Sequence, residues 1–180
     1  RGGYAAAQRA GDLVYDCREQ AAALFGLYDP SRVVFTQNAT HALNIAIHAL
    51  ARPGMKTAVS GFEHNAVTRP LHALGARVTV AGRKLFDWED TLAAFDQALS
   101  ENPVAAIFTH VSNVFGYVLP VEQLAELCHL HGVPFLVDAA QSAGSRPVSL
   151  KKLGAEFIAM PGHKGLLGPQ GTGLLLCARD

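Results

Sequence analysis

The stretch Val133-Pro134-Phe135-Leu136-Val137-Asp138 holds the most apolar run of the chain and ends in a carboxylate. A short apolar run without alternating polar residues is typical of a strand that helices cover on both faces. Similar runs recur on either side of it, at residues 33–36, 57–60, 77–81, 104–109, 157–160 and 174–177. Together with residues 133–138, they predict a sheet of seven strands in the interior of the fold.

Apolar residues at helical spacing occupy segments between these runs, at residues 40–50, 87–99 and 121–131. Strand and helix therefore alternate from about residue 32 to residue 138. This order predicts a mainly parallel sheet in a three-layer α/β/α fold. The Gly-rich segment 162–173 is too short for a crossover helix, so we expect one of the last two strands to run antiparallel.

A further helix is predicted near the start of the chain, where Leu13, Cys17, Ala21 and Leu24 share one helical face. Gly26 follows as a stop signal, and the pattern is that of a docking helix. The cysteines Cys17, Cys128 and Cys177 are far apart and form no C-x-x-C pair. This spacing indicates neither a disulfide framework nor a zinc site, and we expect all three to be small core residues.

The composition indicates a folded domain with no strong charge. Of 180 residues, 49% are hydrophobic and 17% charged, and the 15 basic residues balance the 15 acidic ones. Nucleic acid is not an expected partner, because no cationic field would attract its phosphates. No apolar run is long enough to cross a membrane, and no signal peptide opens the chain, so we expect a cytoplasmic protein. The chain begins at Arg1 without a Met and stops soon after an apolar run, so we expect an excerpt of a longer protein.

Polar side chains follow most of the expected strands. Because ligands bind beyond the carboxyl ends of the strands in open α/β sheets, these positions are the candidate site. They are Thr36-Gln37-Asn38-Ala39-Thr40, Glu63-His64-Asn65, Thr109-His110-Val111-Ser112-Asn113, Asp138-Ala139-Ala140-Gln141 and Pro161-Gly162-His163-Lys164-Gly165.

Three of these residues carry suggestive chemistry, each with an ordinary alternative. Thr40 stands at an expected helix start, where it could bind an anion or simply cap the helix. Asp138 ends a buried strand and needs a partner, which a cationic heterocycle nitrogen or an Arg would provide. Lys164 in its Gly-rich turn could form a Schiff base with a ligand, or it could be an ordinary solvated lysine. A phosphate site, a strand-end Asp, a His and a late Lys are together the parts that a pyridoxal phosphate enzyme needs.

The motifs make this reading specific, because the chain resembles the class V aminotransferase family of fold-type I pyridoxal phosphate enzymes. Within that family it is most similar to the cysteine desulfurase and selenocysteine lyase-like group. The resemblance covers nearly all 180 residues. It rests on Thr36-Gln37-Asn38-Ala39-Thr40-His41-Ala42-Leu43-Asn44, Glu63-His64-Asn65-Ala66, Ser112-Asn113-Val114-x-Gly116, Val137-Asp138-Ala139-Ala140-Gln141 and Gly162-His163-Lys164-x-x-x-Gly168-Pro169-x-Gly171-x-Gly173.

The resemblance implies a role for each candidate residue. Lys164 would hold the cofactor as a Schiff base and later move the substrate's α proton, while Asp138 would keep the pyridine nitrogen protonated. Gln141 would donate to the ring's phenolate oxygen, and His64 would stack on the ring and assist proton transfer. Asn113 would lie near the substrate carboxylate or the ring oxygen.

The phosphate would be held by the N–H of Ala39, the hydroxyl of Thr40 and the imidazole of His163. Relatives place a Ser before Gly-His-Lys, where this chain has Pro161, so one phosphate contact is missing.

The implied activity is removal of sulfur or selenium from cysteine or selenocysteine to give alanine, and the alternative is aminotransfer on another small amino acid. The resemblance also implies a homodimer and a possible sulfur-acceptor protein. The family's mobile Cys and carboxylate-binding Arg would follow the end of this chain. We therefore expect residues 1–180 to be the large cofactor-binding domain of an aspartate aminotransferase-like fold, without the N-terminal segment and small C-terminal domain. Such a piece is expected to be inactive alone.

Rival interpretations have weaker support. Ala140-Gln141-Ser142-Ala143-Gly144 approximates the nucleophile elbow of an α/β hydrolase, with Ser142 as nucleophile, yet the acid and His that must follow are limited to Glu156 and His163. The glycines in 168–173 have the wrong order for a dinucleotide fingerprint. His129 and His131 would point to different sides of a helix, so no metal site is predicted.

Overall fold

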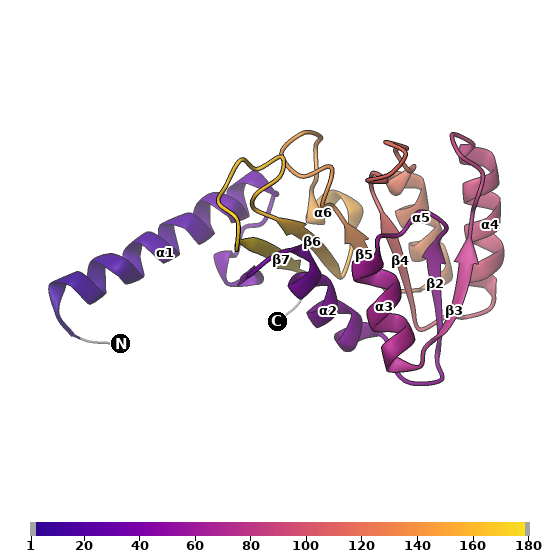
Figure 1. Ribbon diagram of the computed structural model, residues 1–180, viewed down its shortest axis with the longest axis horizontal. Coiled ribbons are helices and arrows are strands. Elements are labelled where there is room, and N and C mark those ends of the chain that lie inside the picture. Colours follow the sequence, from indigo (N-terminus) through magenta and orange to yellow (C-terminus); the bar gives the residue numbers. More distant parts are fainter. Residues whose placement is uncertain (1–2, 179–180) are drawn as a thin grey trace.

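A seven-stranded sheet forms the centre of the molecule, in the strand order β1-β7-β6-β5-β4-β2-β3 (Figure 1). The structure is a computed structural model, and it describes residues 3–178. The strands are β1 (Val33–Thr36), β2 (Lys56–Ser60), β3 (Arg77–Ala81), β4 (Ala105–Thr109), β5 (Phe135–Asp138), β6 (Phe157–Pro161) and β7 (Gly173–Cys177). All seven predicted strands are confirmed, with ends that differ by at most two residues.

The sheet is parallel from β3 to β6 and changes direction at one strand. Neighbouring strands from β3 through β2, β4 and β5 to β6 pair in parallel, whereas β7 pairs antiparallel with both β6 and β1. This confirms the expectation for the last two strands, because the short segment between β6 and β7 allows the chain only to turn back. The mainly parallel order brings the carboxyl ends of β2, β4, β5 and β6 to one edge.

Helices cover both faces of the sheet and make it the middle of three layers (Figure 1). The helices are α1 (Ala5–Leu24), α2 (Ala39–Leu50), α3 (Asn65–Leu74), α4 (Trp88–Ser100), α5 (Val121–His131) and the short α6 (Leu150–Leu153), with a 3₁₀ turn η1 (Pro30–Arg32). Leu43 and Ile47 of α2 and Val67 and Leu71 of α3 pack on one face. Side chains from α4, α5 and α6 share a core on the other face.

Successive residues of each central strand enter opposite cores, as the period of two requires. In β4, Ile107 belongs to the core under α2 and α3, whereas Phe108 belongs to the core under α4 and α5. Leu136 and Val137 of β5 divide in the same way. All four side chains are fully buried. The continuous apolar runs of the sequence therefore reflect a sheet buried on both faces.

Helix α3 was not predicted. Pro70 lies inside it and removes one backbone donor, and its polar residues hide a short apolar stripe. The signal was nevertheless present, because the buried residues Ala66, Val67, Pro70 and Leu71 recur at helical spacing.

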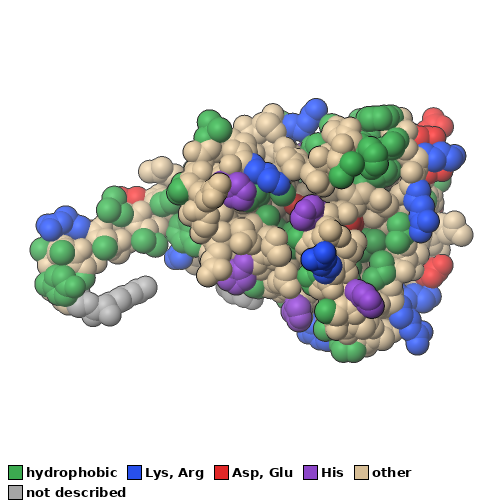
Figure 2. Space-filling model, viewed as in Figure 1, with side chains coloured by type: hydrophobic (Ala, Val, Ile, Leu, Met, Phe, Trp, Pro, Cys, Tyr) green, Lys and Arg blue, Asp and Glu red, His purple; other side chains and the backbone are tan. Residues whose placement is uncertain are grey.

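Helix α1 projects from the sheet and packs on it only near its C-terminal end, where the Arg18 guanidinium also lies over the Phe35 ring of β1 (Figures 1 and 2). Ala22 is its one buried residue, whereas Leu13 and Leu24 are 70% and 65% exposed. Of the predicted apolar face, only Ala21 therefore packs against the core of the described residues. The cysteine prediction is wrong for Cys17, which is exposed; Cys128 is buried and Cys177 half-buried.

No helix of residues 3–178 has the length and apolar character needed to cross a bilayer.

Candidate active site

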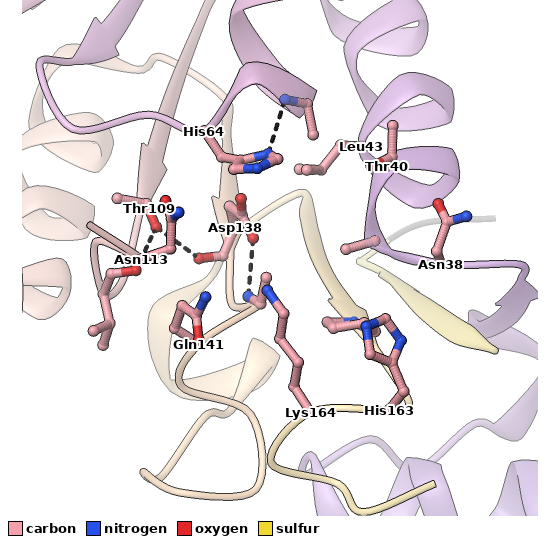
Figure 3. Close-up of a pocket in the computed structure, with 15 residues that line it drawn as sticks. Asn38, Thr40, Leu43, His64, Thr109, Asn113, Asp138, Gln141, His163 and Lys164 are labelled. Atoms are coloured by element: carbon pink, nitrogen blue, oxygen red, sulfur yellow. Dashed lines mark hydrogen bonds between the residues drawn. The ribbon is translucent and has the colours of Figure 1, made fainter. Parts of the chain in front are cut away.

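A cavity of about 170 Å³ opens at the carboxyl edge of the parallel strands (Figure 3). All eight residues predicted for the site line it, and they come from five separate segments of the chain: Ala39, Thr40, His64, Asn113, Asp138, Gln141, His163 and Lys164. The parallel strand order explains this convergence, because each segment follows the carboxyl end of a strand at the same edge. Asn38, Leu43, Ala66, Thr109, Val111, Ala140 and Pro161 complete the lining.

Asp138 lies at the centre of the cavity, at the end of β5 (Figure 3). The residue is only 3% exposed, and Oδ1 accepts a hydrogen bond from the N–H of Ala140 at 2.9 Å. Burial raises the pKa of this carboxyl, while the Ala140 N–H and the nearby His64 and Lys164 act in the opposite direction. No Lys or Arg among residues 3–178 forms an ion pair with it. A buried carboxylate in this setting is a strong site for a cationic ligand atom.

Helix α2 begins beside Asp138 with its backbone donors available. Asn38 is the N-cap, since its side chain accepts from the N–H of His41 at 2.8 Å. No described residue accepts from the N–H groups of Ala39 or Thr40. The helix thus starts one residue earlier than predicted, and Thr40 is not its cap. Its exposed hydroxyl and the two free N–H groups form an anion site at the positive end of the helix.

His64 faces the cavity from the start of α3 (Figure 3). Its Nδ1 accepts from the N–H of Ala66 at 3.0 Å, so the ring serves as the N-cap of the helix. Because Nδ1 accepts, a neutral ring carries its proton on Nε2. The capping bond therefore fixes both the orientation and the tautomer of the imidazole.

Lys164 and His163 belong to the turn that follows β6, and both side chains are exposed. This turn packs backbone against backbone on the segment that follows Gln141. A β-carbon on Gly144 would overlap the carbonyl group of Gly165, and one on Gly165 would overlap the carbonyl oxygen of Ala143. Glycine at these two positions lets Lys164 lie beside Gln141 at the cavity (Figure 3).

The remaining predicted residues come from the loops after β5 and β4. Gln141 is half-buried two residues beyond Ala139, and Asn113 is exposed in a loop closed by a bridge between Val111 and Val118. Thr109, which was not nominated, pairs in register with Asp138 and lines the same cavity.

The hydrolase alternative is wrong. Ser142 is fully buried and absent from the cavity lining, and its hydroxyl donates to the carbonyl of Ala139 at 3.5 Å. A nucleophile must be reachable by its substrate, and this hydroxyl is not. Among residues 3–178 no group of three or more His, Cys, Asp or Glu could hold a metal ion.

The sheet with one antiparallel strand and this cavity at its edge define the large domain of pyridoxal phosphate-dependent enzymes of the desulfurase type. The family model for the class V aminotransferases matches residues 1–180, and the chain belongs to that family. The motifs in the sequence and the fold therefore agree on the same family.

Curated relatives extend this assignment. A probable cysteine desulfurase of Methanothermobacter thermautotrophicus is 35% identical over 184 residues, covering 100% of this chain and 46% of the relative. The cysteine desulfurase IscS of Pectobacterium carotovorum is 35% identical over 178 residues, covering 95% and 43%. The chain thus spans slightly less than half the length of these relatives.

Solved structures agree with the fold. The apo cysteine desulfurase of Thermococcus onnurineus superposes with a TM-score of 0.88 at 30% identity, over 98% of this chain and 45% of that one. A C-DES mutant with glycine covalently linked to its pyridoxal phosphate cofactor gives 0.86 at 26% identity, over 99% and 49%. In that protein the same fold holds the cofactor.

Proposed function

We propose that the chain forms the cofactor-binding part of a pyridoxal phosphate-dependent enzyme that acts on a small amino acid, with cysteine desulfuration as its reaction. The observation that carries this proposal is the buried Asp138 carboxyl, which shares one cavity with Lys164 and the free helix start at Ala39 and Thr40. A cationic ring nitrogen, an aldehyde and a phosphate are complementary to these three features.

The residues present fit the cofactor. When bound, pyridoxal phosphate supplies an electron sink for bonds at the α carbon of an amino acid. Asp138 would hold a proton at the ring nitrogen, because a positive partner stabilises a buried carboxylate. Lys164 would provide the amine that attaches the cofactor, and its Nζ would take and return the α proton of the substrate.

The phosphate is bound at the start of α2. The N–H groups of Ala39 and Thr40, the Thr40 hydroxyl and the His163 ring are the available donors. Pro161 lines the cavity at the end of β6 and offers neither a hydroxyl nor an N–H. Binding of the phosphate therefore depends more strongly on the helix start.

The other side chains orient the ring and the substrate. His64, held by its capping bond, would contact the cofactor ring, and its Nε2 would be available to assist proton transfer. Gln141 would donate to the ring's phenolate oxygen. Asn113 is exposed in the cavity lining, where it would meet the substrate carboxylate or the ring oxygen.

Desulfuration also needs a thiol that accepts the sulfur. None of the three cysteines lines the cavity, and burial raises the pKa of Cys128 to about 12. We therefore assign the accepting thiol to a residue outside these 180, or to an acceptor protein, in a homodimeric enzyme. Named cysteine desulfurases among the relatives favour this reaction over aminotransfer.

The test is to add pyridoxal phosphate and look for a visible absorption band that borohydride reduction fixes to one lysine. Peptide mapping should locate the label on Lys164, and the band should be lost in Lys164→Ala. Lys151→Ala, which removes an exposed lysine of α6, is the matched control and should keep the band. Labelling of another lysine would contradict the assignment. Alanine release from cysteine would distinguish desulfuration from aminotransfer, which would release a keto acid.

A further inference from the structure

Glu63 joins two segments of the cavity without lining it. It precedes His64 in the turn between β2 and α3, and its Oε1 accepts from the N–H of Thr109 at 2.7 Å. The same oxygen accepts from the hydroxyl of Ser60, at the end of β2. A single oxygen of Glu63 thus fastens the turn that contains His64 to the end of β4.

The backbone explains why a side chain is needed there. Parallel pairing between β2 and β4 ends at Val59 and Ile107, because the chain beyond Ser60 bends toward β3. The N–H of Gly61 donates to the carbonyls of Ala81 and Gly82 instead. Thr109 is therefore left without a carbonyl from β2, and the Glu63 carboxyl takes that place. A buried N–H without an acceptor would be costly.

Thr109 connects this carboxyl to the ring site. It pairs in register with Asp138, and the N–H of the next residue, His110, donates to the carbonyl of Asp138 at 2.9 Å. Its own hydroxyl donates to the carbonyl of Val111, at the base of the loop that carries Asn113. Glu63 therefore bonds to the segment from which Asp138 and Asn113 are positioned, and it is covalently adjacent to His64.

The charge state of Glu63 follows from its surroundings. Glu63 as a whole is half-buried. Its Oε2 atom is buried and has no hydrogen-bond partner among the described residues. Burial raises the pKa of Glu63 to about 8, and the Asp138 carboxylate adds to the rise, while Ser60 and Thr109 oppose it. Asp138 is the charged group that acts on it from the neighbouring strand ends, and Ser60 and Thr109 are uncharged donors. At neutral pH the Glu63 carboxyl is therefore mainly protonated.

We propose that Glu63 is a positioning residue of the cofactor site, whose carboxyl fixes the His64 turn to the strand end beside Asp138. This inference rests on the proposed function for the identity of the ligand. The hydrogen bonds that it invokes exist without the ligand, so they are testable in the free protein.

Two variants separate the parts of this proposal. Glu63→Gln keeps an oxygen that accepts from Thr109 and never ionises, so it should keep the wild-type affinity for pyridoxal phosphate. Glu63→Ala removes the acceptor and should weaken binding about tenfold, as expected when a buried donor loses its partner. It should also change the circular dichroism of the bound cofactor, because His64 is no longer fixed over the ring. Glu126→Ala, an exposed residue of α5, is the matched control.

Nuclear magnetic resonance of the cofactor-free protein supplies a second readout. The amide proton of Thr109 should move with pH in the wild type, with a midpoint near 8, and should not titrate in Glu63→Gln. This measurement decides the proposal even if Glu63→Ala does not fold.

Three results would overturn the inference: a Thr109 amide that ignores pH in the wild type, Glu63→Ala with wild-type affinity and dichroism, or Glu63→Gln as impaired as Glu63→Ala. If the wild type does not bind the cofactor, the proposed function fails, while the Thr109 amide still tests whether Glu63 fixes this turn.

Discussion

Gly144 and Gly165 meet backbone to backbone, with no space between them for a β-carbon on Gly144. This contact determines where the turn with His163 and Lys164 lies relative to Gln141. It joins two loops that the sequence separates, and it shows that the site depends on residues with no side chain.

Replacing Gly144 by Ala should therefore damage both stability and cofactor binding. The residue has a φ of +85°, and its methyl group would overlap Gly165, so we expect a loss of about 3 kcal/mol or more in the free energy of unfolding. Gly132→Ala has a similar φ of +66° with open space around the β-carbon, and it should cost only about 1 kcal/mol. Chemical denaturation of both variants makes the comparison. Equal losses would show that the contact with Gly165 is unimportant.

Asp138→Asn should separate cofactor binding from stability. The amide keeps an acceptor for the Ala140 N–H and removes a carboxyl whose pKa burial raises. We expect the cofactor-free variant to be at least as stable as the wild type at pH 7. Its affinity for pyridoxal phosphate should fall by about 100-fold or more, as expected for the loss of a buried charge pair. Absorbance titration measures the affinity, and an unchanged value would refute the role of Asp138.

The start of α2 allows a paired test of Asn38 and Thr40. Asn38→Ala removes the N-cap and should lower the free energy of unfolding by about 1 kcal/mol. Thr40→Ala removes an exposed hydroxyl that is not the cap, so stability should not change. Phosphate binding should weaken about tenfold in Thr40→Ala, corresponding to one hydrogen bond to a charged group. Thermal unfolding together with titration of pyridoxal phosphate distinguishes the two effects. A marked loss of stability in Thr40→Ala would contradict this division.

The stability of the cofactor-free protein should fall as the pH rises from about 4.5 to about 8. The folded state keeps a proton on Glu63, whose pKa rises from 4.5 to about 8, whereas the unfolded chain has lost it. Since the folded state binds more protons in this range, each step upward in pH favours unfolding. The raised pKa of Asp138 acts in the same direction. Urea unfolding at several pH values measures the slope, which should be smaller in Glu63→Gln. A free energy of unfolding that rises with pH over this range would refute the raised pKa of Glu63.

Pro161→Ser tests the missing phosphate contact. Pro161 is buried at the end of β6 and lines the cavity, so a hydroxyl there would reach the bound phosphate. We expect tighter binding of pyridoxal phosphate, by about tenfold for one added hydrogen bond to a charged group. The cofactor-free variant should be no more stable than the wild type, because the new hydroxyl then has no ligand. Weaker binding would show that the proline ring itself shapes the cavity.

The sequence predicted the sheet and the members of the site because both follow from local patterns. Apolar runs such as 133–138 mark the strands, and parallel order then places Asp138 and Thr40 at one edge. Glu63 could not be assigned a role in this way. Its acceptor function depends on where β2 stops pairing with β4, and Thr109 lies far along the chain. The exposure of α1 was also hidden, since an apolar stripe does not reveal what it packs against.

The position of β7 has a consequence for folding kinetics. Strand β1 is at the sheet edge and pairs only with β7 among the described strands, although the two lie near opposite ends of the chain. Such a pairing closes a very long loop, and contacts of that kind form slowly. Helix α2 follows β1 directly, so its phosphate-binding start reaches its final place only when β7 has joined the sheet. We therefore expect the ability to bind phosphate to emerge in the last phase of refolding, after the central parallel strands have formed.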